Sequence, residues 1–396
     1  MYKIVVHDYA GHPFSLTLSK ELSKKYKVNH LFFKNDYGPK ADFENQFNHN
    51  LSIEGIGSDI SYDKNNFFTR FIKDFIYGNK VAKRINEIKP DIIISGQCPT
   101  FAQELIINLA KKNNLNFTIW VQDFYSIAVY YILKKKISFL SLPISFLFKY
   151  FEKKQFKLAD HLVLITKDFS YQLDKWGIDQ DKYSIIKNWG NLDEIKFNIN
   201  KDIQFLKENN LDTAKFTLLY TGTLALKHNP DLILKIASFN PNIQILLIGV
   251  GSGYDKIKNS KDLPKNIQLL PLQPFNKMNS ILNSSDACLS ILDEEAGKYS
   301  VPSKILNYLC AGKPVIFSGP SENLASKIIV ESKSGGSFDS NNFHNLNQFI
   351  KKLIDEPDTR KELSRNAREY AEKNFKVNEK VKKFENIFLN NKQNKK

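Results

Sequence analysis

The segment 294–319, EEAGKYSVPSKILNYLCAGKPVIFSG, contains residues suited to holding an anion. Pro302 and Ser303 suit the first positions of a helix, and Gly312 suits the left-handed position just after its end. The first turn of such a helix leaves backbone N–H groups unpaired at the positive end of the helix dipole, where Lys304 adds a full charge. This combination predicts a phosphate or diphosphate site. Many strand–loop–helix units of α/β proteins share this pattern, so a purely structural interpretation stays open.

Several other loops place glycines or polar residues directly after an apolar run that predicts a buried strand. In open parallel sheets, ligands bind beyond the carboxyl ends of the strands, so these loops are expected to face a site. The cluster around Gly249 lacks the G-x-G-x-x-G spacing, which argues against a nicotinamide dinucleotide. For His12 the alternative is a loop histidine without a role. The residues in question are Gly11, His12, Gln122, Asp123, Gly222, Thr223, Lys227, Gly249 and Gly251.

The sequence gives little evidence of residues spaced to bind a metal. Asp179 and Asp181 have the D-x-D spacing, but they follow Trp176-Gly177 in a polar stretch that predicts a turn or helix cap. The histidines show no paired spacing for zinc, and the three cysteines are far apart. We therefore expect no bound metal, and we interpret the cysteines as inert core thiols.

Length and composition are those of a globular protein with two domains. The chain has 396 residues, 42% hydrophobic and 25% charged, and no apolar run reaches the ~18 residues of a membrane-spanning helix. The start, MYKIVVHDYAG, does not have the pattern of a secretory signal, so a cytoplasmic location is expected. The formal charge of +15 favours anionic partners such as nucleotides, nucleic acid or anionic lipid. Nucleic acid is the weaker choice, because zinc-finger spacing, a basic recognition helix and RNP-like strands are all missing from the sequence.

Strands and helices are expected to alternate along the whole chain. This rhythm predicts a doubly wound, mostly parallel sheet in each half, with helices on both faces. We place the first domain at 1–195 and the second at 196–374, with a last helix in 375–396 that packs back on the first domain. The segment 35–57 is polar and irregular, so it is predicted to be a surface loop or insertion. Strands are expected near 3–7, 28–33, 90–96, 117–123, 159–166, 183–189, 216–222, 243–248, 267–270, 287–291 and 315–318.

The segment 134–157 combines apolar and basic residues. Lysines flank twelve mostly apolar residues with Pro143 near the centre, and this apolar run is too short to span a bilayer. It suits a stretch that lies in the membrane interface, with phenylalanines in the lipid and lysines toward anionic headgroups. A buried helix pair with solvated lysine ends is the alternative.

Taken together, these motifs resemble those of retaining glycosyltransferases of family 4. The resemblance covers nearly the whole chain and implies the GT-B arrangement, an α/β fold with two Rossmann-like domains facing each other across a cleft. The stretches 8–13, 18–22 and 120–123 are similar to the colanic-acid and O-antigen transferases, including the N-acetylfucosaminyl type. Residues 220–224 with 227–229, and 301–304 with 311–315, are similar to the donor-site motifs of that subgroup.

The resemblance implies roles for particular residues. The second domain would bind the nucleotide-sugar, with its diphosphate held by the helix start at Ser303 and by the basic side chains of Lys227 and Lys304. The glycine loop of the first domain would close over the diphosphate. No cofactor besides the UDP-sugar substrate and no metal are implied. The implied catalytic residues are Lys227, Lys304, Gln122, Asp123 and Glu295. The implied donor-binding residues are Gly11, His12, Gly222, Thr223, Gly249, Gly251, Leu272, Pro302, Ser303, Ile305 and Asn307.

The sequence departs from the family's pattern at three places. The family often has two glutamates separated by seven residues; Tyr299 and Asn307 occupy those positions here. The basic residue usual after the strand-end glycine is missing, since Thr223 and Leu224 follow Gly222. Gln122 stands where many relatives have histidine, which argues against base assistance at that position. Glu294 or Glu295 is left to reach the sugar from a loop of different length.

The function implied is a peripheral enzyme on the inner face of the plasma membrane. It would move a sugar, an N-acetylated hexose from a UDP donor, onto a polyprenyl-diphosphate-linked saccharide in surface polysaccharide, O-antigen, capsule or lipopolysaccharide synthesis. Segment 134–157 would hold it to the anionic membrane surface. The alternatives are a UDP-sugar epimerase of the same architecture and a non-catalytic scaffold of a polysaccharide assembly complex.

Overall fold

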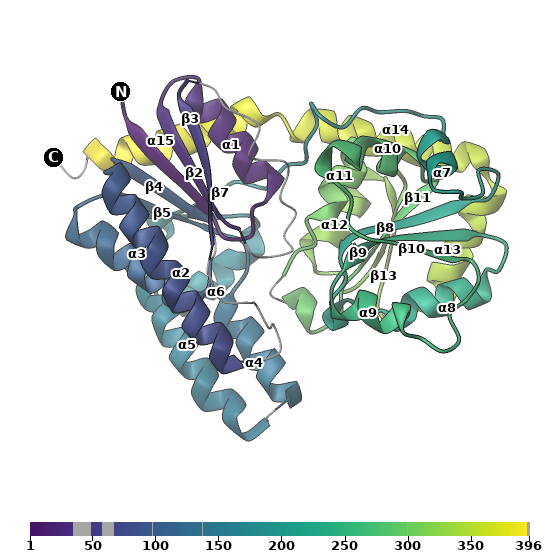
Figure 1. Cartoon of the computed structure of the whole chain (residues 1–396), viewed down its shortest axis with the longest axis horizontal. Coiled ribbons are helices and arrows are strands. Elements are labelled where there is room, and N and C mark those ends of the chain that lie inside the picture. The colour runs from purple at the N-terminus through teal and green to yellow at the C-terminus, as the bar shows by residue number, and fades with distance from the viewer. Residues whose placement is uncertain (35–48, 58–66, 97, 137, 299, 394–396) are drawn as a thin grey trace. The chain divides into compact units, whose positions relative to one another are not determined.

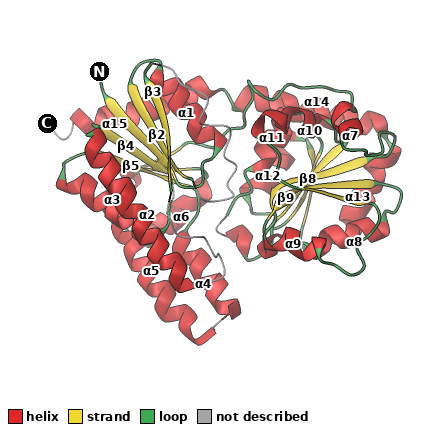
Figure 2. Ribbon diagram, viewed as in Figure 1, coloured by secondary structure: helices red, strands yellow, loops and turns green. Residues whose placement is uncertain are grey.

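The chain folds into two compact α/β units (Figures 1 and 2). The computed structural model describes residues 1–34, 49–57, 67–96, 98–136, 138–298 and 300–393. Unit 1 consists of Met1–Asn188 and Val377–Lys396, and unit 2 consists of Trp189–Lys376. The two sheets with helices on both faces confirm the predicted fold class.

The chain enters unit 2 earlier than the boundary expected after residue 195. Asn191 donates a backbone hydrogen bond to Asn307 Oδ1 at 3.2 Å, inside unit 2. Gly190 lies so close to the same region that an added Cβ would come within 2.5 Å of Cys310 Sγ and 2.6 Å of the Leu306 carbonyl oxygen. The chain around residues 190 and 191 is therefore packed on unit 2.

The sheet of unit 1 has seven parallel strands in the order β3-β2-β1-β4-β5-β6-β7. Its central strands are runs of β-branched and aromatic residues buried on both faces, as parallel sheets require. The strands are β1 (Lys3–Asp8), β2 (Lys27–Phe33), β3 (Leu51–Ile56), β4 (Ile92–Gly96), β5 (Asn116–Val121), β6 (His161–Leu164) and β7 (Tyr183–Ile185).

Helices cover both faces of this sheet (Figure 1). On one face α1 packs beside α15, the last helix of the chain. On the other face α2, α3 and α5 form a continuous layer, and α4 packs against α5. The helices are α1 (Pro13–Ser23), α2 (Phe67–Ile88), α3 (Thr100–Lys112), α4 (Tyr125–Lys136), α5 (Ser138–Leu158), α6 (Ser170–Lys175) and α15 (Val377–Gln393).

Unit 2 has a six-stranded parallel sheet in the order β10-β9-β8-β11-β12-β13. Its strands are β8 (Thr217–Thr223), β9 (Gln244–Val250), β10 (Ile267–Leu270), β11 (Ala287–Ile291), β12 (Val315–Ser318) and β13 (Gly335–Phe338). Its helices are α7 (Gln204–Glu208), α8 (Asp231–Phe239), α9 (Ser252–Lys258), α10 (Met278–Asn283), α11 (Lys304–Cys310), α12 (Leu324–Ser332), α13 (Phe343–Asp355) and α14 (Pro357–Asn374).

The strand order reverses at the first strand of each sheet. In unit 1, β1 lies between β2 and β4, and in unit 2, β8 lies between β9 and β11. At such a point the connections leave toward opposite faces and open a crevice beyond the carboxyl ends of the strands. The fold therefore places the Gly11 loop, the Gly222 turn and the start of α11 where a ligand binds in this kind of sheet.

One expectation about local structure needs correction. Within 35–57, which was expected to be irregular, Leu51–Ile56 forms the edge strand β3, and 35–48 lie outside the described residues. The segment 134–157 forms the end of α4 and most of α5, which continues through Pro143. Across the described ranges, none of the helices has both the length and the apolar character needed to cross a bilayer.

Candidate functional site

A buried carboxylate organises the glycine loop after β1. Asp8 accepts hydrogen bonds from the His12 backbone nitrogen at 2.5 Å, from Ser15 Oγ at 2.7 Å and from His12 Nδ1 at 3.1 Å. Gly11 takes the left-handed conformation, with φ +68°, and its N–H donates to the Asp8 carbonyl. Asp8 thus fixes the loop and the ring of His12. The sequence analysis did not single out Asp8, although its position at the strand end was a usable signal.

The contact with Asp8 favours the charged form of His12. Burial lowers the pKa of His12, but the charge of Asp8 and the hydrogen bond between them outweigh burial, and Asp123 adds to the increase, so the pKa is raised. The same contact, together with the hydrogen bond from Ser15, overcomes the effect of burial on Asp8 and lowers its pKa. The protonated form of this histidine suits contact with an anionic ligand.

Gln122 and Asp123 follow β5 directly, and hydrogen bonds hold the chain on both sides of them. Gln122 Oε1 accepts from Asn188 Nδ2 at 2.7 Å. Beyond Asp123, the buried Glu152 of α5 accepts from Ser126 Oγ at 2.5 Å and from the Ser126 N–H at 3.1 Å, at the start of α4. Burial raises the pKa of Glu152 to about 7. Glu152 is a positioning residue that the sequence did not reveal.

In unit 2, the ammonium group of Lys304 lies over an aromatic ring. Lys304 Nζ is 3.5 Å from the centre of the Tyr220 ring, a cation–π contact. The nitrogen is buried and has no hydrogen-bond partner among the described residues, although part of the side chain remains exposed. Burial lowers the pKa of Lys304 well below its usual value. An anionic ligand beside this nitrogen would favour its charged form.

Gly222 borders that ammonium group, and its backbone conformation favours glycine. It lies two residues after Tyr220 in β8, so both residues face the same side of the sheet. An added Cβ at Gly222 would approach Lys304 Nζ to 3.9 Å, and Gly222 has φ +102°. The sequence suggested Gly222 and Lys304 but did not suggest Tyr220, whose ring completes this arrangement.

The glycines at the ends of β8 and β9 permit close approach of the two strands. Gly222 and Gly249 are partners in the strand register, and an added Cβ at Gly249 would lie 2.4 Å from the Gly222 carbonyl oxygen. Gly251 has φ +114°, and its added Cβ would lie 2.9 Å from the Leu224 carbonyl oxygen. Larger residues would push apart the strand ends that carry the site.

Substituting Gly249→Ala is therefore expected to destabilise the chain by about 2–3 kcal/mol, because the new methyl group collides with backbone that cannot rotate away. Gly177→Ala is the matched control. Gly177 has φ +65° but no atom within 4 Å of an added Cβ, so its substitution measures backbone strain alone, about 1 kcal/mol. Urea unfolding of both variants checks this, and an equal or smaller loss for Gly249→Ala would contradict it.

Helix α11 is anchored by its middle and leaves its first turn accessible. Tyr308 OH accepts from the Thr221 N–H at 3.3 Å and donates to the Leu289 carbonyl at 3.4 Å, which ties α11 to β8 and β11. Ser303 precedes the helix, is exposed, and makes no side-chain capping bond within the described structure. Ile305 is fully buried, so only its backbone can contribute to a ligand site.

Asn307 makes a hydrogen bond within unit 2. Its Oδ1 accepts the hydrogen bond from Asn191 described above, so this oxygen is already engaged. Tyr299, at the other departure from the glutamate pair, lies outside the described residues. Neither position supplies a carboxylate.

The remaining predicted residues lie in loops after the strands. The backbone of Lys227 lies in a 3-10 helix, Leu226–His228, but its side chain is not among the described ones. Thr223 ends β8 and is exposed, while Leu272 and Pro302 are half-buried in loops. The Glu295 N–H donates to Asp293 Oδ1 at 3.3 Å. These positions follow strands β8, β10 and β11 in the chain.

A pocket of about 360 Å³ lies beside the Leu226–His228 turn. Its lining includes Asn229, Asp293 and Glu294, and Ser340 donates a 3.4 Å hydrogen bond to Glu294 Oε2. Its acidic and amide oxygens suit hydroxyl groups better than phosphates.

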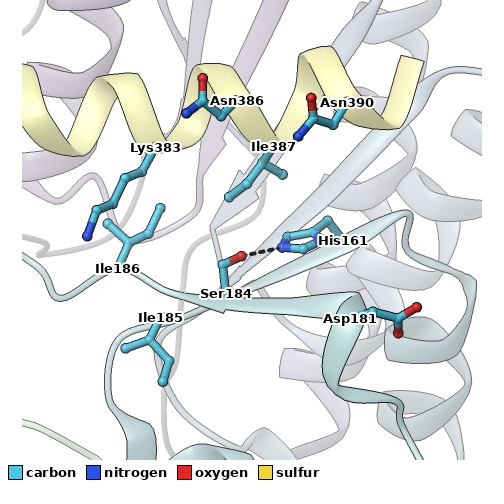
Figure 3. A pocket seen from close by; sticks show the side chains of 9 residues that line it. All are labelled: His161, Asp181, Ser184, Ile185, Ile186, Lys383, Asn386, Ile387 and Asn390. Atoms are coloured by element: carbon cyan, nitrogen blue, oxygen red, sulfur yellow. Dashed lines mark hydrogen bonds between the residues drawn. The ribbon is translucent and has the colours of Figure 1, made fainter. Parts of the chain in front are cut away.

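A larger pocket of about 570 Å³ lies along the edge strand β7 of unit 1 (Figure 3). His161 Nε2 and Ser184 Oγ are 2.9 Å apart in it, and α15 forms one side. None of the predicted site residues lines it. Asp179 and Asp181 flank the start of a 3-10 helix nearby, and the described part of the chain contains no group of His, Cys, Asp or Glu arranged to hold a metal.

Comparison with solved structures identifies the class of fold. The two-unit chain is similar to sucrose-phosphate synthase from Thermosynechococcus elongatus, with a TM-score of 0.77, 12% identity, and 98% of this chain and 99% of that chain covered. It is also similar to Anabaena HepE in complex with UDP and glucose, with a TM-score of 0.70, 12% identity and coverage of 98% and 99%. WaaG, a glycosyltransferase involved in lipopolysaccharide biosynthesis, is similar with a TM-score of 0.68 and 13% identity. The match covers 96% of this chain and 98% of WaaG. The fold is that of the GT-B glycosyltransferases.

Sequence comparison relates the second unit to a protein family, and the chain to two curated proteins. Residues 202–370 match the family described as glycosyl transferases group 1. The chain is 24% identical over 231 residues to WcaI of Escherichia coli K12, whose name places it among colanic acid biosynthesis glycosyl transferases, with 57% of this chain and 56% of WcaI covered. It is 25% identical over 241 residues to the uncharacterized glycosyltransferase MJ1069 of Methanocaldococcus jannaschii, with 59% of each covered. The chain thus spans a little over half the length of these curated relatives.

Proposed function

We propose that this chain is a glycosyltransferase whose second unit binds the diphosphate of a nucleotide-sugar. The observation that carries the proposal is the buried ammonium group of Lys304, which lies at the strand-order reversal of unit 2 beside Gly222 and the start of α11. The family match over 202–370 and the similarity to HepE, solved with UDP, support this assignment.

The site offers stabilisation of the leaving group. As the bond between the sugar C1 and the phosphate oxygen breaks, negative charge grows on the diphosphate. Lys304 and the free N–H groups at the start of α11 stabilise that charge without a metal. The transfer is proposed to retain the configuration at C1. The acceptor oxygen attacks C1 from the side the diphosphate leaves, and its proton passes to the leaving phosphate oxygen. Gln122 is not basic, which favours this route over base assistance.

The donor is proposed to be a UDP-linked N-acetylated hexose. The N-acetylated sugar is suggested by the resemblance to the N-acetylfucosaminyl type, and the similarity to HepE, solved with UDP and glucose, supports UDP as the nucleotide. The pocket lined by Asn229, Asp293 and Glu294 supplies oxygens that accept hydrogen bonds from sugar hydroxyls.

The acceptor is proposed to be a polyprenyl-diphosphate-linked saccharide at the anionic inner face of the plasma membrane. The imidazolium of His12, held by Asp8, provides unit 1 with a cation for a phosphate group. The product would enter surface polysaccharide, O-antigen, capsule or lipopolysaccharide synthesis, in keeping with the names of WcaI and WaaG.

The test is to incubate the purified chain with UDP-sugars and a polyprenyl-diphosphate-linked sugar and to measure released UDP. Acceptor-dependent release is expected. Release of UDP without acceptor supports the epimerase alternative. A folded chain that binds UDP but turns over no donor supports the scaffold and rules out the enzyme.

A further inference from the structure

The pocket along β7 contains polar side chains that the proposed reaction does not use. His161, which lines it, is the first residue of β6, at the amino end of that strand. Gly11 and Gln122 instead follow the carboxyl ends of β1 and β5. The volume of about 570 Å³ lies within the range of ~300–1,000 Å³ that small-molecule sites occupy. The pocket is therefore large enough for a ligand and separate from the predicted site residues of unit 1.

The strand side of the pocket carries a neutral hydrogen-bonded pair (Figure 3). His161 Nε2 and Ser184 Oγ are 2.9 Å apart. Burial lowers the pKa of His161, and the charge of Lys182 adds to the decrease while Asp181 opposes it, so the ring is neutral at pH 7. A hydroxyl group has one donor hydrogen and two acceptor lone pairs. Ser184, which is half-buried, therefore keeps capacity for a ligand hydroxyl group beside its bond to His161.

The helix side of the pocket presents two amide groups. Asn386 and Asn390 are four positions apart on α15, so they lie on one side of the helix, and both line the pocket. Their side chains are exposed, and neither amide is hydrogen-bonded to another described residue. An amide has two donor hydrogens and an acceptor oxygen, so it can bind two neighbouring hydroxyl groups at once.

The lining as a whole has no net charge. Among its nine residues, Asp181 and Lys383 carry formal charges, which are of opposite sign, and both side chains are exposed. The pocket thus lacks the excess of positive charge that would attract a phosphate group. Ile186 is buried and Ile387 half-buried in the lining, and they supply apolar surface for the CH groups of a ligand.

We infer that this pocket binds a short neutral saccharide. Sugar hydroxyl groups bond to Asn386, Asn390 and Ser184, and the CH groups of the sugar rings pack on the isoleucines. The inference rests on the proposed function for the origin of the saccharide, because a glycosyltransferase extends or releases a glycan. Binding in this pocket requires no turnover and can be measured separately.

The experiment is NMR of the full chain, with the ring signals of His161 assigned from His161→Gln. Glucose, N-acetylglucosamine, lactose and maltotriose are added in turn, in the presence of UDP. At least one of these saccharides should give a saturable shift of the His161 signals, because the ring lies in the pocket. Inorganic phosphate, added as a separate probe, should leave the signals in place.

The double variant Asn386→Ala/Asn390→Ala should weaken binding of that saccharide about tenfold or more, because it removes two hydrogen-bonding groups. Alanine is the best helix former, so α15 should keep its fold. The matched control is Asn345→Ala, at an exposed position of α13 in unit 2, which should leave the affinity unchanged. UDP binding and the thermal midpoint, measured on every variant, report on folding.

The absence of a saturable His161 shift with all four saccharides would overturn the inference, and so would an unchanged affinity in the double variant. A shift with phosphate alone would also overturn it, because the pocket would then select anions. Saccharide binding by a chain that releases no UDP would support the pocket and count against the proposed enzyme. Acceptor-dependent UDP release by a chain whose His161 signals no saccharide shifts would do the opposite.

Discussion

Replacing Lys304 with methionine is expected to lower turnover about 100-fold or more, because it removes the cation that stabilises the leaving diphosphate. Methionine keeps the length of the apolar stem and its contact with Tyr220. The measurement is the steady-state rate of UDP release, together with the affinity for UDP, which should also fall.

The thermal stability of Lys304→Met, in contrast to its turnover, should not fall. The Lys304 ammonium group is buried without a hydrogen-bond partner among the described residues, so the folded state bears a desolvation cost that methionine removes. The thermal midpoint of Lys304→Met should equal or exceed that of the unchanged chain. Lys361→Met, at an exposed position on α14, is the control and should change neither quantity. Unaltered turnover in Lys304→Met would reject its role with the diphosphate.

The second large effect is expected from Asp8→Asn. The substitution removes the charge that accepts hydrogen bonds from the His12 N–H, His12 Nδ1 and Ser15 Oγ, and it points an amide group at these donors. The free energy of unfolding should fall by about 3 kcal/mol, the scale for breaking a buried ion pair by removing one partner. Urea unfolding measures this, and Asp358→Asn at an exposed position is the control.

The pH dependence gives an independent check on Asp8. The pKa of His12 is raised in the folded chain, so its contribution to stability is complete below the unfolded pKa of about 6.5 and is lost as pH rises through the folded pKa. In Asp8→Asn the burial of the ring remains while the attraction is gone, so the pKa of His12 should fall. Titration of the His12 ring by NMR measures this decrease in pKa. Identical titration curves for Asp8→Asn and the unchanged chain would contradict the effect of Asp8 on His12.

Repeating patterns explain why much of the fold could be predicted. Runs such as Ile92–Ile94 are buried on both faces and predict parallel strands, and glycines that follow them predict turns at the strand ends. Gly11, Gly222 and Gly251 have the positive φ angles that such turns demand. The edge strand β3 was missed, because it follows a long polar segment.

The residues that position the side chains of the candidate site could not be predicted in the same way. Glu152 and Ser126 are 26 positions apart, and only the packing of α5 against α4 brings them together. Tyr220 resembles any aromatic residue of a buried strand until α11 places Lys304 over its ring. The Asn307 oxygen accepts a bond from the chain entering unit 2, a contact that the sequence did not reveal. Such roles depend on contacts distant in sequence.

The return of α15 to unit 1 has a consequence for biosynthesis. Phe384 of α15 packs on Trp120 of β5 at 4.9 Å between ring centres, and Phe388 is buried beside Tyr26. During translation these side chains leave the ribosome only after all of unit 2 has been synthesised. Unit 2 is continuous and can complete its fold first, whereas unit 1 waits with the Trp120 face uncovered. Unit 1 is therefore the first part to be synthesised and the last to complete its fold.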